Sequence, residues 1–522
     1  MTRGADVVMQ VLAAQGVRDV FALSGNQIMP LFDASLDAGI RLYHTRHEAA
    51  TVYMAEGYAQ LSRGLGVALV TAGAGLGNAL GPLLTARASD TPVLLLSGDS
   101  PVARDGQGAF QEMDQVALTR SLTKWSVRVN RAGDLAETIA NAARVARQGR
   151  PGPVHVSLPA DVLMAEAEMV RSSSSDPVPE INVAALRDWL DAARRPVIVL
   201  GPALNPTRQP GLNARLEAAT GAPVVAMESP RGLNDPSLGA LGGVFAEADR
   251  VLLLGKPLDF TLQFGAAAPR AGWAVIHADP DELSRARNNC AERLTLTIEA
   301  DPVGVARALA ASSLPTRDAE WRLRVQAACA RRTMGLKSEK HISSSDLCAA
   351  VQKVLEAVEA PVLVCDGGEF GQWAQAGVTA PRRIINGVSG AIGGGLCYAM
   401  GARAADPKAT VFALMGDGTA GFHLSEFETA VREDLPFVAI IGNDQRWNAE
   451  HQIQLRDFGS DRLHGCGLSA ARYDEAMIAL GGFGALVTDL AELPGALRAA
   501  IASGRPACLD VRIDGQPAPV VT

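Results

Sequence analysis

A short acidic turn enclosed by two apolar segments constrains the fold of this chain more than any other feature. Residues 411–415 form an apolar run that leads directly into the Gly-Asp-Gly turn at 416–418, which indicates a buried strand and a tight turn. Apolar residues at helical spacing over 427–431 precede a second apolar, β-branched run at 437–441. The pattern predicts a strand–helix–strand unit whose two strands run parallel in a buried sheet.

Oxygen-bearing side chains follow both of these predicted strands. Asp417 comes after the first strand, and Asn443 and Asp444 come after the second. Ligands of open α/β sheets bind outside the carboxyl ends of the strands, where helix N-termini favour phosphate. Because carboxylate and amide oxygens suit a hard cation, we expect a metal and a phosphate group at this edge. A lone Gly-Asp-Gly is also a common turn, so the metal site needs support from other parts of the chain.

The same alternation of strand-like and helix-like segments extends over most of the sequence. We predict the α/β class, with three doubly wound parallel-sheet domains at residues 1–165, 189–310 and 344–515. The polar segments 166–188, which contains a serine run, and 311–343 have the composition of linkers.

Composition narrows the class of protein. The chain has 522 residues, of which 48% are apolar, and a net charge of −8, which is typical of a globular protein and argues against nucleic acid as a partner. Its seven cysteines are scattered without a C-x-x-C pair, so we expect neither a disulfide framework nor cysteine-bound zinc. The N-terminus lacks an apolar signal core, and no run of about 18 apolar residues occurs. We therefore expect a cytoplasmic protein that does not enter a membrane.

Three motifs, in this order, carry a resemblance to a known family. They are Arg46-His47-Glu48 at the start of a predicted helix, Phe110-Gln111 before a glutamate, and the acidic turn at 416–418. Together with the segment 150–162, they resemble the thiamine-diphosphate-dependent enzymes of the acetolactate synthase, benzaldehyde lyase and 2-hydroxyacyl-CoA lyase group. The resemblance spans all three predicted domains and implies thiamine diphosphate and Mg²⁺ as cofactors.

The resemblance assigns the first domain to the pyrimidine ring of the cofactor and the third domain to its diphosphate. In that family the active site lies between two subunits, which implies a homodimer or a homotetramer. Glu48 is then the catalytic glutamate, whose carboxyl group hydrogen-bonds the pyrimidine and promotes proton loss from the thiazolium ring. The alternative for Glu48 is a carboxylate favoured by the dipole in the first turn of a helix. We interpret His47 as structural, because adjacent residues of a helix do not share a face.

Further cofactor contacts follow from the resemblance, residue by residue. A glycine-rich loop runs from Thr71 to Asn78, and Ile392 corresponds to the bulky apolar residue that holds the cofactor bent. The residues expected at the cofactor are Glu48, Thr71, Asn78, Gly367, Gly368, Glu369, Phe370, Gly390, Ile392, Gly416, Asp417, Gly418, Thr419, Asp444 and Trp447. The alternatives are a plain strand-to-helix turn at 71–78, an ordinary core position for Ile392 and a surface loop at Trp447.

The resemblance also indicates the metal ligands. Asp417 matches the first ligand, the helix after Gly418 receives the diphosphate, and the backbone carbonyl of Arg446 is the third ligand. Asp444 falls, without gaps, where the family usually has an asparagine, whereas a shift of one residue would make Asn443 the ligand. An aspartate suits Mg²⁺ as a hard oxygen donor, so both alternatives stay open.

The expected substrate pocket is rich in amides. It comprises Gly25, Asn26, Gln27, Phe110, Gln111 and Trp447. Gln111 would face the reacting carbonyl, and Gln27 stands where benzaldehyde lyase has a histidine, so we expect Gln27 and Gln111 to join Glu48 as catalytic residues. Asn26 and Gln27 replace small residues of the family, which makes the pocket floor more polar and makes pyruvate a less secure donor.

The central domain departs from the acetolactate synthases. After the apolar run 251–254, the segment Lys256-Pro-Leu-Asp replaces an arginine-rich flavin loop, which puts FAD in doubt. The segment is similar to that of 2-hydroxyacyl-CoA lyases and oxalyl-CoA decarboxylases, whose middle domain binds a nucleotide. A nucleotide such as ADP or CoA is therefore a second candidate ligand of this domain.

Three functions compete, because fold and cofactor do not determine the substrate. The leading hypothesis is an acetolactate synthase-like enzyme that decarboxylates a 2-oxo acid and joins the product to an aldehyde or ketone. The alternative is a lyase that cleaves a 2-hydroxy ketone or a 2-hydroxyacyl-CoA. The third, a cofactor-binding subunit without activity, is opposed by the presence of Glu48.

Overall fold

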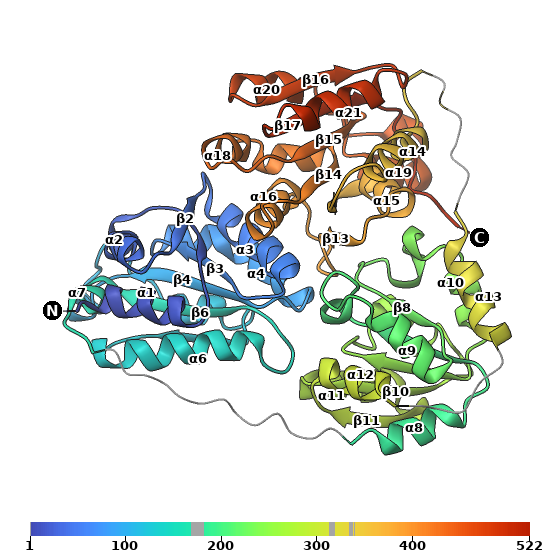
Figure 1. The fold of residues 1–522 in the computed structure, drawn as a ribbon, viewed down its shortest axis with the longest axis horizontal. Coiled ribbons are helices and arrows are strands. Elements are labelled where there is room, and N and C mark those ends of the chain that lie inside the picture. Colours follow the sequence, from blue (N-terminus) through green and yellow to red (C-terminus); the bar gives the residue numbers. More distant parts are fainter. Residues whose placement is uncertain (1, 169–181, 313–318, 333–337, 339, 522) are drawn as a thin grey trace.

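Three parallel sheets, one in each part of the chain, form the framework of the molecule (Figure 1). The computed structural model describes residues 2–168, 182–312, 319–332, 338 and 340–521. Helices cover both faces of each sheet, which is why the inner strands are continuous apolar runs. This architecture is the predicted α/β class with three doubly wound sheets.

The first unit contains a six-stranded sheet in the order β2-β1-β3-β4-β6-β5. Its strands are β1 Asp19–Ala22, β2 Arg41–His44, β3 Gly66–Val70, β4 Val93–Asp99, β5 Trp125–Arg128 and β6 Val154–Pro159. Its helices are α1 Gly4–Ala14, α2 Met29–Asp37, α3 Glu48–Ser62, α4 Ala74–Ala88, α5 Gln115–Thr119, α6 Leu135–Arg147 and α7 Ala160–Met164. Strands β3 and β4 are buried along their whole length. The loops that follow them begin at the carboxyl edge of the sheet.

The central unit contains a five-stranded sheet in the order β11-β10-β9-β7-β8. Its strands are β7 Pro196–Leu200, β8 Val224–Ala226, β9 Arg250–Leu254, β10 Gly272–His277 and β11 Leu294–Glu299. Its helices are α8 Ala184–Asp191, α9 Leu212–Thr220, α10 Leu241–Phe245, α11 Pro280–Cys290, α12 Pro302–Ala310 and α13 Ala319–Ala330.

The third unit repeats the strand order of the first, as β13-β12-β14-β15-β17-β16. Its strands are β12 Pro361–Asp366, β13 Arg382–Ile385, β14 Thr410–Gly416, β15 Val438–Asn443, β16 Phe483–Val487 and β17 Ala507–Arg512. Its helices are α14 Ser344–Leu355, α15 Gly368–Gly377, α16 Gly395–Ala405, α17 Asp417–Ala420, α18 Glu426–Arg432, α19 Asn448–Phe458, α20 Tyr473–Ala479 and α21 Leu493–Ala502.

Both predicted linkers contain helix, which sequence composition alone did not indicate. Helix α13 lies inside the segment 311–343, where Trp321 and Val325 are buried one turn apart in the core of the central unit. The indole nitrogen of Trp321 also donates to the carbonyl oxygen of Pro196 at 2.8 Å. Helix α8 begins at the end of the segment 166–188, and residues 169–181 of that prediction lie outside the described residues. A few apolar residues on one helix face are enough for docking, even in a polar segment.

Helices α3 and α16 join the first and third units within the chain (Figure 1). A Cβ on Gly57 would lie 2.8 Å from the carbonyl oxygen of Tyr398, so the two helix backbones touch. At this crossing the buried carboxylate of Glu56 accepts a hydrogen bond from the Tyr398 hydroxyl at 3.0 Å, and burial raises its pKa. Because Glu48 is the first residue of α3, this contact positions Glu48 relative to the third unit.

Among the described residues, no helix combines the length and the apolar character that crossing a membrane requires.

Candidate active site

The carboxyl ends of three neighbouring strands meet at one edge of the third sheet. Strand β12 pairs with β14, and β14 pairs with β15 so that Gly416 lies opposite Gly442. The strand ends therefore bring Asp366, Asp417 and Asp444 to the same edge. This is the edge at which ligands bind in open α/β sheets.

Asp417 and Asp444 form a pair of carboxylates at this edge. Asp417 is only 1% exposed, and its Oδ2 atom has no hydrogen-bond partner among the described residues. Burial raises the pKa of both groups, and the charge of Asp417 raises the pKa of Asp444 further. Tyr473 donates its hydroxyl to the backbone carbonyl of Asp417 at 2.9 Å, which anchors the turn from α20. A buried oxygen without a partner is unfavourable unless a ligand or cation satisfies it.

Asn443 is directed away from this pair. Its amide nitrogen donates to Asp510 at 2.9 Å and to the carbonyl oxygen of Ala471 at 3.3 Å. Its carbonyl oxygen accepts the backbone N–H of Gln445 at 3.2 Å. The side chain of Arg446 donates to the carbonyl oxygen of Asp444 at 3.1 Å.

The turn after β14 differs from the helix expected there. The segment after Gly416 forms the four-residue α17 and a short 3-10 turn, and the amphipathic helix begins only at Glu426. The ring of Trp447 packs on Gly418, where an added Cβ would lie 2.7 Å from it. Glycine is required because a side chain would displace the indole, so these residues close one side of the edge together.

The turn after β12 lies against the turn after β14. A Cβ on Gly367 would overlap the side chain of Thr419, so the two segments touch. Gly368 is exposed and begins α15, whereas the side chain of Phe370 packs under Gly442 in the core. Only the backbone of Phe370 therefore faces this edge. The carboxyl of Glu369 accepts from Gln372 at 2.8 Å, and burial raises the pKa of Glu369.

A glycine-rich loop that carries Gly390 and Ile392 is held from two sides. Oδ2 of Asp366 accepts the backbone N–H groups of Gly393 at 3.0 Å and Gly395 at 2.6 Å. The carbonyl oxygen of Gly393 lies 2.7 Å from Nδ1 of His423. Burial raises the pKa of Asp366 to about 7, and its Oδ1 atom has no partner among the described residues. Ile392 is half-buried and lies outside the buried core clusters.

Glu48 lies at the corresponding edge of the first sheet. His47 caps α3, because its Nδ1 atom accepts the backbone N–H of Ala49 at 3.1 Å. Asn78, which follows the glycine-rich loop on α4, donates its amide to Oε2 of Glu48 at 2.9 Å. Glu48 is half-buried and Asn78 is exposed, so the carboxylate is accessible from this side.

Two amides and a hydroxyl form a second polar group beside Glu48. Thr71 donates its hydroxyl to Gln27 at 2.6 Å, and Gln27 donates its amide nitrogen to Gln111 at 2.7 Å. Gly25 lies against the side chain of Thr71 in this group. Asn26 is exposed and forms no part of the contact, although it is adjacent to Gln27.

Phe110 belongs to the loop that carries Gln111 and is 71% exposed. Within the described residues, no hydrogen bond or ion pair joins the group around Glu48 and Gln27 to Asp417 or Asp444.

Sequence reasoning missed residues that support these groups. Gln115 is buried, accepts the backbone N–H of Gly73 at 2.9 Å and donates to the carbonyl oxygen of Gly98 at 2.8 Å. His423 and Tyr473 hold backbone groups of the third-sheet edge. Gln115 lies shortly after Phe110 and Gln111 in the sequence, and this proximity was a usable signal. His423 and Tyr473 have no local motif that marks them.

The residues of the third-sheet edge fit Mg²⁺ and a diphosphate. Two carboxylates and nearby backbone carbonyls supply hard oxygen donors, and one carboxylate oxygen is unsatisfied. Among the described residues no group of three or more His, Cys, Asp and Glu side chains gathers at one point. The remaining ligands of a cation here would therefore be carbonyl, water or phosphate oxygens.

The central sheet, where a nucleotide was expected and FAD was in doubt, has a different arrangement at its strand ends. Its switch point lies between β7 and β9, which end at Leu200 and Leu254 and are followed by Gly201 and Gly255. A Cβ on Gly201 would overlap the carbonyl of Gly255, so the two backbones already touch. Lys256 is buried beside Asp259, at 3.2 Å, and burial lowers its pKa. A nucleotide as ligand of this domain, and the doubt about FAD, therefore stay predictions.

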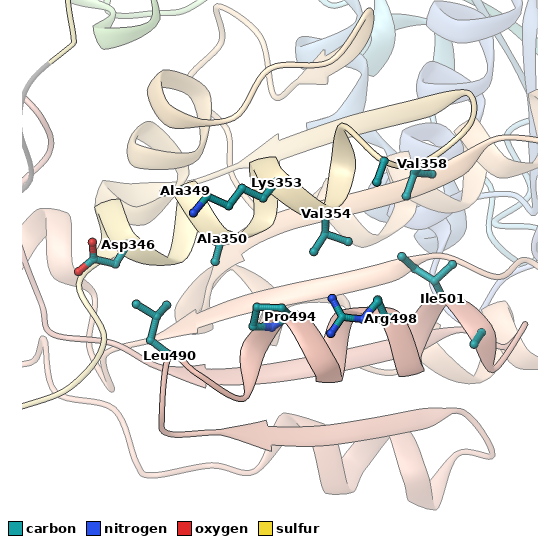
Figure 2. A pocket seen from close by; sticks show the side chains of 12 residues that line it. Asp346, Ala349, Ala350, Lys353, Val354, Val358, Leu490, Pro494, Arg498 and Ile501 are labelled. Carbon is teal, nitrogen blue, oxygen red and sulfur yellow. The ribbon is translucent and has the colours of Figure 1, made fainter.

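A separate hollow of about 730 Å³ lies between α14 and α21 (Figure 2). Alanines and the side chains of Val354 and Ile501 line it, with Lys353 and Arg498 on its walls. None of the expected site residues belongs to it.

Comparison with known proteins is consistent with this geometry. Residues 2–118 match the N-terminal, and residues 366–511 the C-terminal, thiamine pyrophosphate-binding domain of the thiamine pyrophosphate enzymes. Human 2-hydroxyacyl-CoA lyase 2 is 31% identical over 93% of this chain and 85% of its own length. The acetolactate synthase large subunit IlvG of Mycobacterium tuberculosis is 29% identical over 97% of this chain and 95% of its own length. A 4-hydroxybenzoylformate decarboxylase of Rhodococcus jostii RHA1 has the same fold, with a TM-score of 0.82, 24% identity and 98% and 99% coverage.

Proposed function

The chain belongs to the thiamine pyrophosphate enzymes, and from this premise we propose that it breaks or forms the carbon–carbon bond beside a carbonyl group, with thiamine diphosphate and Mg²⁺. The observation that carries the proposal is the buried carboxylate pair at the edge of the third sheet, with its unsatisfied oxygen. When bound, thiamine diphosphate supplies a nucleophilic carbon and a cationic thiazolium ring that takes up the electron pair of the broken bond.

Asp417, Asp444 and the backbone carbonyl of Arg446 would hold Mg²⁺. The choice of Asp444 over Asn443 is supported by the hydrogen bond that commits the Asn443 amide to Asp510. The backbones of 367–370 and 416–419 would surround the diphosphate, since the two turns touch. Ile392 would support the bent cofactor from a loop that Asp366 and His423 hold in place.

Glu48 would exchange a proton with the pyrimidine ring. Asn78 donates to one carboxylate oxygen, which leaves the other available for the ring. Such an acid or base contributes typically about 10²–10⁴-fold to a rate. Glu48 lies in a different unit from Asp417, so a site shared between two copies of the chain is part of the proposal. Exposed Phe110 in the first unit and exposed Phe422 in the third support a homo-oligomer that covers them.

The reaction that the geometry supports best is cleavage of a 2-hydroxyacyl-CoA or a similarly extended 2-hydroxy carbonyl compound. A groove of about 740 Å³ runs between the central and third units, lined by Arg231, Arg331, Gln372 and residues 518–521. Gln372 belongs to α15, so the groove reaches the helix that follows β12. Two arginines in a groove of this size suit a long substrate with an anionic end.

A second candidate is acetolactate synthase-like decarboxylation and ligation of a 2-oxo acid. The similarity to the Mycobacterium tuberculosis acetolactate synthase subunit over 97% of the chain favours it. A small 2-oxo acid would leave the groove between the central and third units without a role.

The test is a substrate panel with thiamine diphosphate and Mg²⁺, which compares pyruvate, glyoxylate, benzoin and a 2-hydroxyacyl-CoA. Aldehyde without CO₂ supports the lyase, whereas CO₂ with acetolactate from pyruvate supports the second candidate. The Glu48→Gln variant should lose about 10²–10⁴-fold in kcat and still bind the cofactor.

Glu137→Gln is the matched control for this variant, because Glu137 is an exposed carboxylate in the first turn of α6. It should keep full activity. Full activity of Glu48→Gln would refute the catalytic role and leave Glu48 as an ordinary helix-start carboxylate.

A further inference from the structure

We propose that a directed hydrogen-bond chain, Thr71 to Gln27 to Gln111, turns the amide nitrogen of Gln111 toward the reacting oxygen of the substrate. Gln27 is then a positioning residue, and Gln111 is a neutral hydrogen-bond donor of fixed orientation. The inference rests on the proposed function, and it specifies how this site recognises the carbonyl or hydroxyl oxygen of its substrate.

The first observation is the direction of the two hydrogen bonds. The Thr71 hydroxyl donates to Oε1 of Gln27 at 2.6 Å. The amide nitrogen of Gln27 is therefore the end that faces Gln111. Nε2 of Gln27 donates to Oε1 of Gln111 at 2.7 Å. The Gln111 oxygen is thereby engaged, and its NH₂ group has no hydrogen-bond partner among the described residues. An amide has one donor end and one acceptor end, so this chain decides which end remains available.

The second observation is that glycine backbones pack against all three side chains. An added Cβ on Gly98 would lie 2.9 Å from Cβ of Gln27, and one on Gly73 would lie 2.9 Å from Cβ of Gln111. Gly25 touches the side chain of Thr71 in the same way. Close packing of this kind leaves the side chains few alternative rotamers.

The third observation is the backbone of Gln111, whose φ of +60° lies in the left-handed region. This conformation costs a non-glycine residue free energy. It is retained only where contacts with the surrounding structure hold the residue in place. Beneath it, Gln115 holds the backbone N–H of Gly73, which is the glycine that packs on Gln111. The local structure therefore directs the Gln111 side chain toward Gln27.

The chemical use of a fixed donor follows from the reaction. When a carbon nucleophile attacks a carbonyl, negative charge develops on the carbonyl oxygen, and an oriented N–H group stabilises that charge. An amide does not titrate, so its contribution stays constant across the working pH range. The site accordingly suits substrates whose reacting oxygen needs a hydrogen bond rather than a proton from the protein.

The decisive variant is Gln27→Glu. An ionised glutamate has only acceptors, so it would take hydrogen bonds from both Thr71 and the NH₂ group of Gln111 and turn the Gln111 donor away from the substrate. We expect kcat to fall about 10²-fold, with KM changed far less, as for loss of one oxyanion donor. Protonation lets the new carboxyl donate again, so the activity of Gln27→Glu relative to the unmodified protein should rise as pH falls.

Three further variants distinguish a loss of Gln111 orientation from general damage to the protein. Gln15→Glu, an exposed amide at the end of α1, makes the same change of charge and should leave activity unchanged. Gln27→Ala should lose activity without the recovery at low pH. Thr71→Val should lose less than Gln27→Glu, and Thr71→Ser should restore the hydroxyl and the rate.

A readout without cofactor or substrate completes the test. In chemical denaturation of the cofactor-free protein, Gln27→Ala and Gln111→Ala should be non-additive, because each removes the same hydrogen bond. Additive losses of stability would refute the proposed hydrogen-bond chain. An unchanged kcat in Gln27→Glu, or a loss of kcat that does not depend on pH, would also refute it. Cofactor binding and the inactivity of Glu48→Gln report on the proposed function separately, so its failure would be recognised on its own.

Discussion

The central sheet and the third sheet each contain a topological switch point, but the charged side chains at their strand ends are paired differently. In the central sheet, β8 and β9 pair on opposite sides of β7. In the third sheet, β13 and β14 pair on opposite sides of β12. At the central edge, Lys256 lies 3.2 Å from Asp259, and Arg150 of the first unit contacts Asp90, Asp279 and Glu282. At the third edge, Asp417 and Asp444 adjoin without an ion pair among the described residues.

This difference shows that topology alone does not locate a site. Both edges offer the crevice in which doubly wound sheets bind ligands. At the central edge the charged side chains form ion pairs with one another, and the backbones of neighbouring strands are in contact. The ion pairs of Arg150 connect the first unit to the central unit. The third edge retains a buried carboxylate oxygen without a partner among the described residues, which a cation or ligand would satisfy.

Asp417→Ala gives the largest expected effect. It removes the unsatisfied carboxylate, so cofactor affinity in the presence of Mg²⁺ should fall by more than about 100-fold, because even outer-sphere partners of a metal contribute about 10–100-fold. Isothermal titration with thiamine diphosphate measures the loss. Asp489→Ala, an exposed aspartate of the same unit, is the control. Equal binding by both variants would remove the contrast between the two edges.

Arg150→Gln tests the opposite edge. The change leaves the buried carboxylates of Asp90 and Glu282 without their shared cation, and breaking a buried ion pair costs about 3 kcal/mol in free energy of unfolding. Denaturant titration measures that loss. Cofactor affinity, measured on protein that remains folded, should stay within about twofold of the unmodified chain, a change of less than about 1 kcal/mol. A strong loss of affinity would place a ligand at the central edge after all.

Asp444→Asn gives the smallest effect and sharpens the assignment at the third edge. The variant keeps an oxygen ligand but loses a charge, so the Mg²⁺ concentration needed for half-maximal cofactor binding should rise by about 10-fold. Asn443→Ala should instead lower stability, because it releases Asp510 from a buried hydrogen bond at 2.9 Å. The reverse outcome, with Mg²⁺ dependence following Asn443, would reassign the ligand.

Much of the architecture was predictable because its signals are local. Apolar runs, helical spacing and the turn at 416–418 indicated parallel strands, whereas the role of Glu48, which rests on a motif, stays a prediction. The docking of α13, in the polar segment 311–343, was not predicted, because it depends on burial of Trp321 against the distant central sheet. The packing of Trp447 on Gly418 and Phe422 was not predicted, because it has no counterpart in a local pattern.

The sequence by itself determined which chemical groups this protein places at its strand ends. These are Asp417, Asp444 and Glu48 as carboxylates and Gln27 and Gln111 as amides. It did so because strand and turn signals are carried by neighbouring residues.

Only the tertiary structure decided which partners those groups have. Asn443 and Asp444 are equivalent as oxygen donors until Asp510 on β17 engages one of them. Gln27 and Gln111 are 84 residues apart, and their hydrogen bond exists only because two loops of the first unit pack together. A side chain's partners depend on contacts between distant segments, and a linear pattern carries no such information.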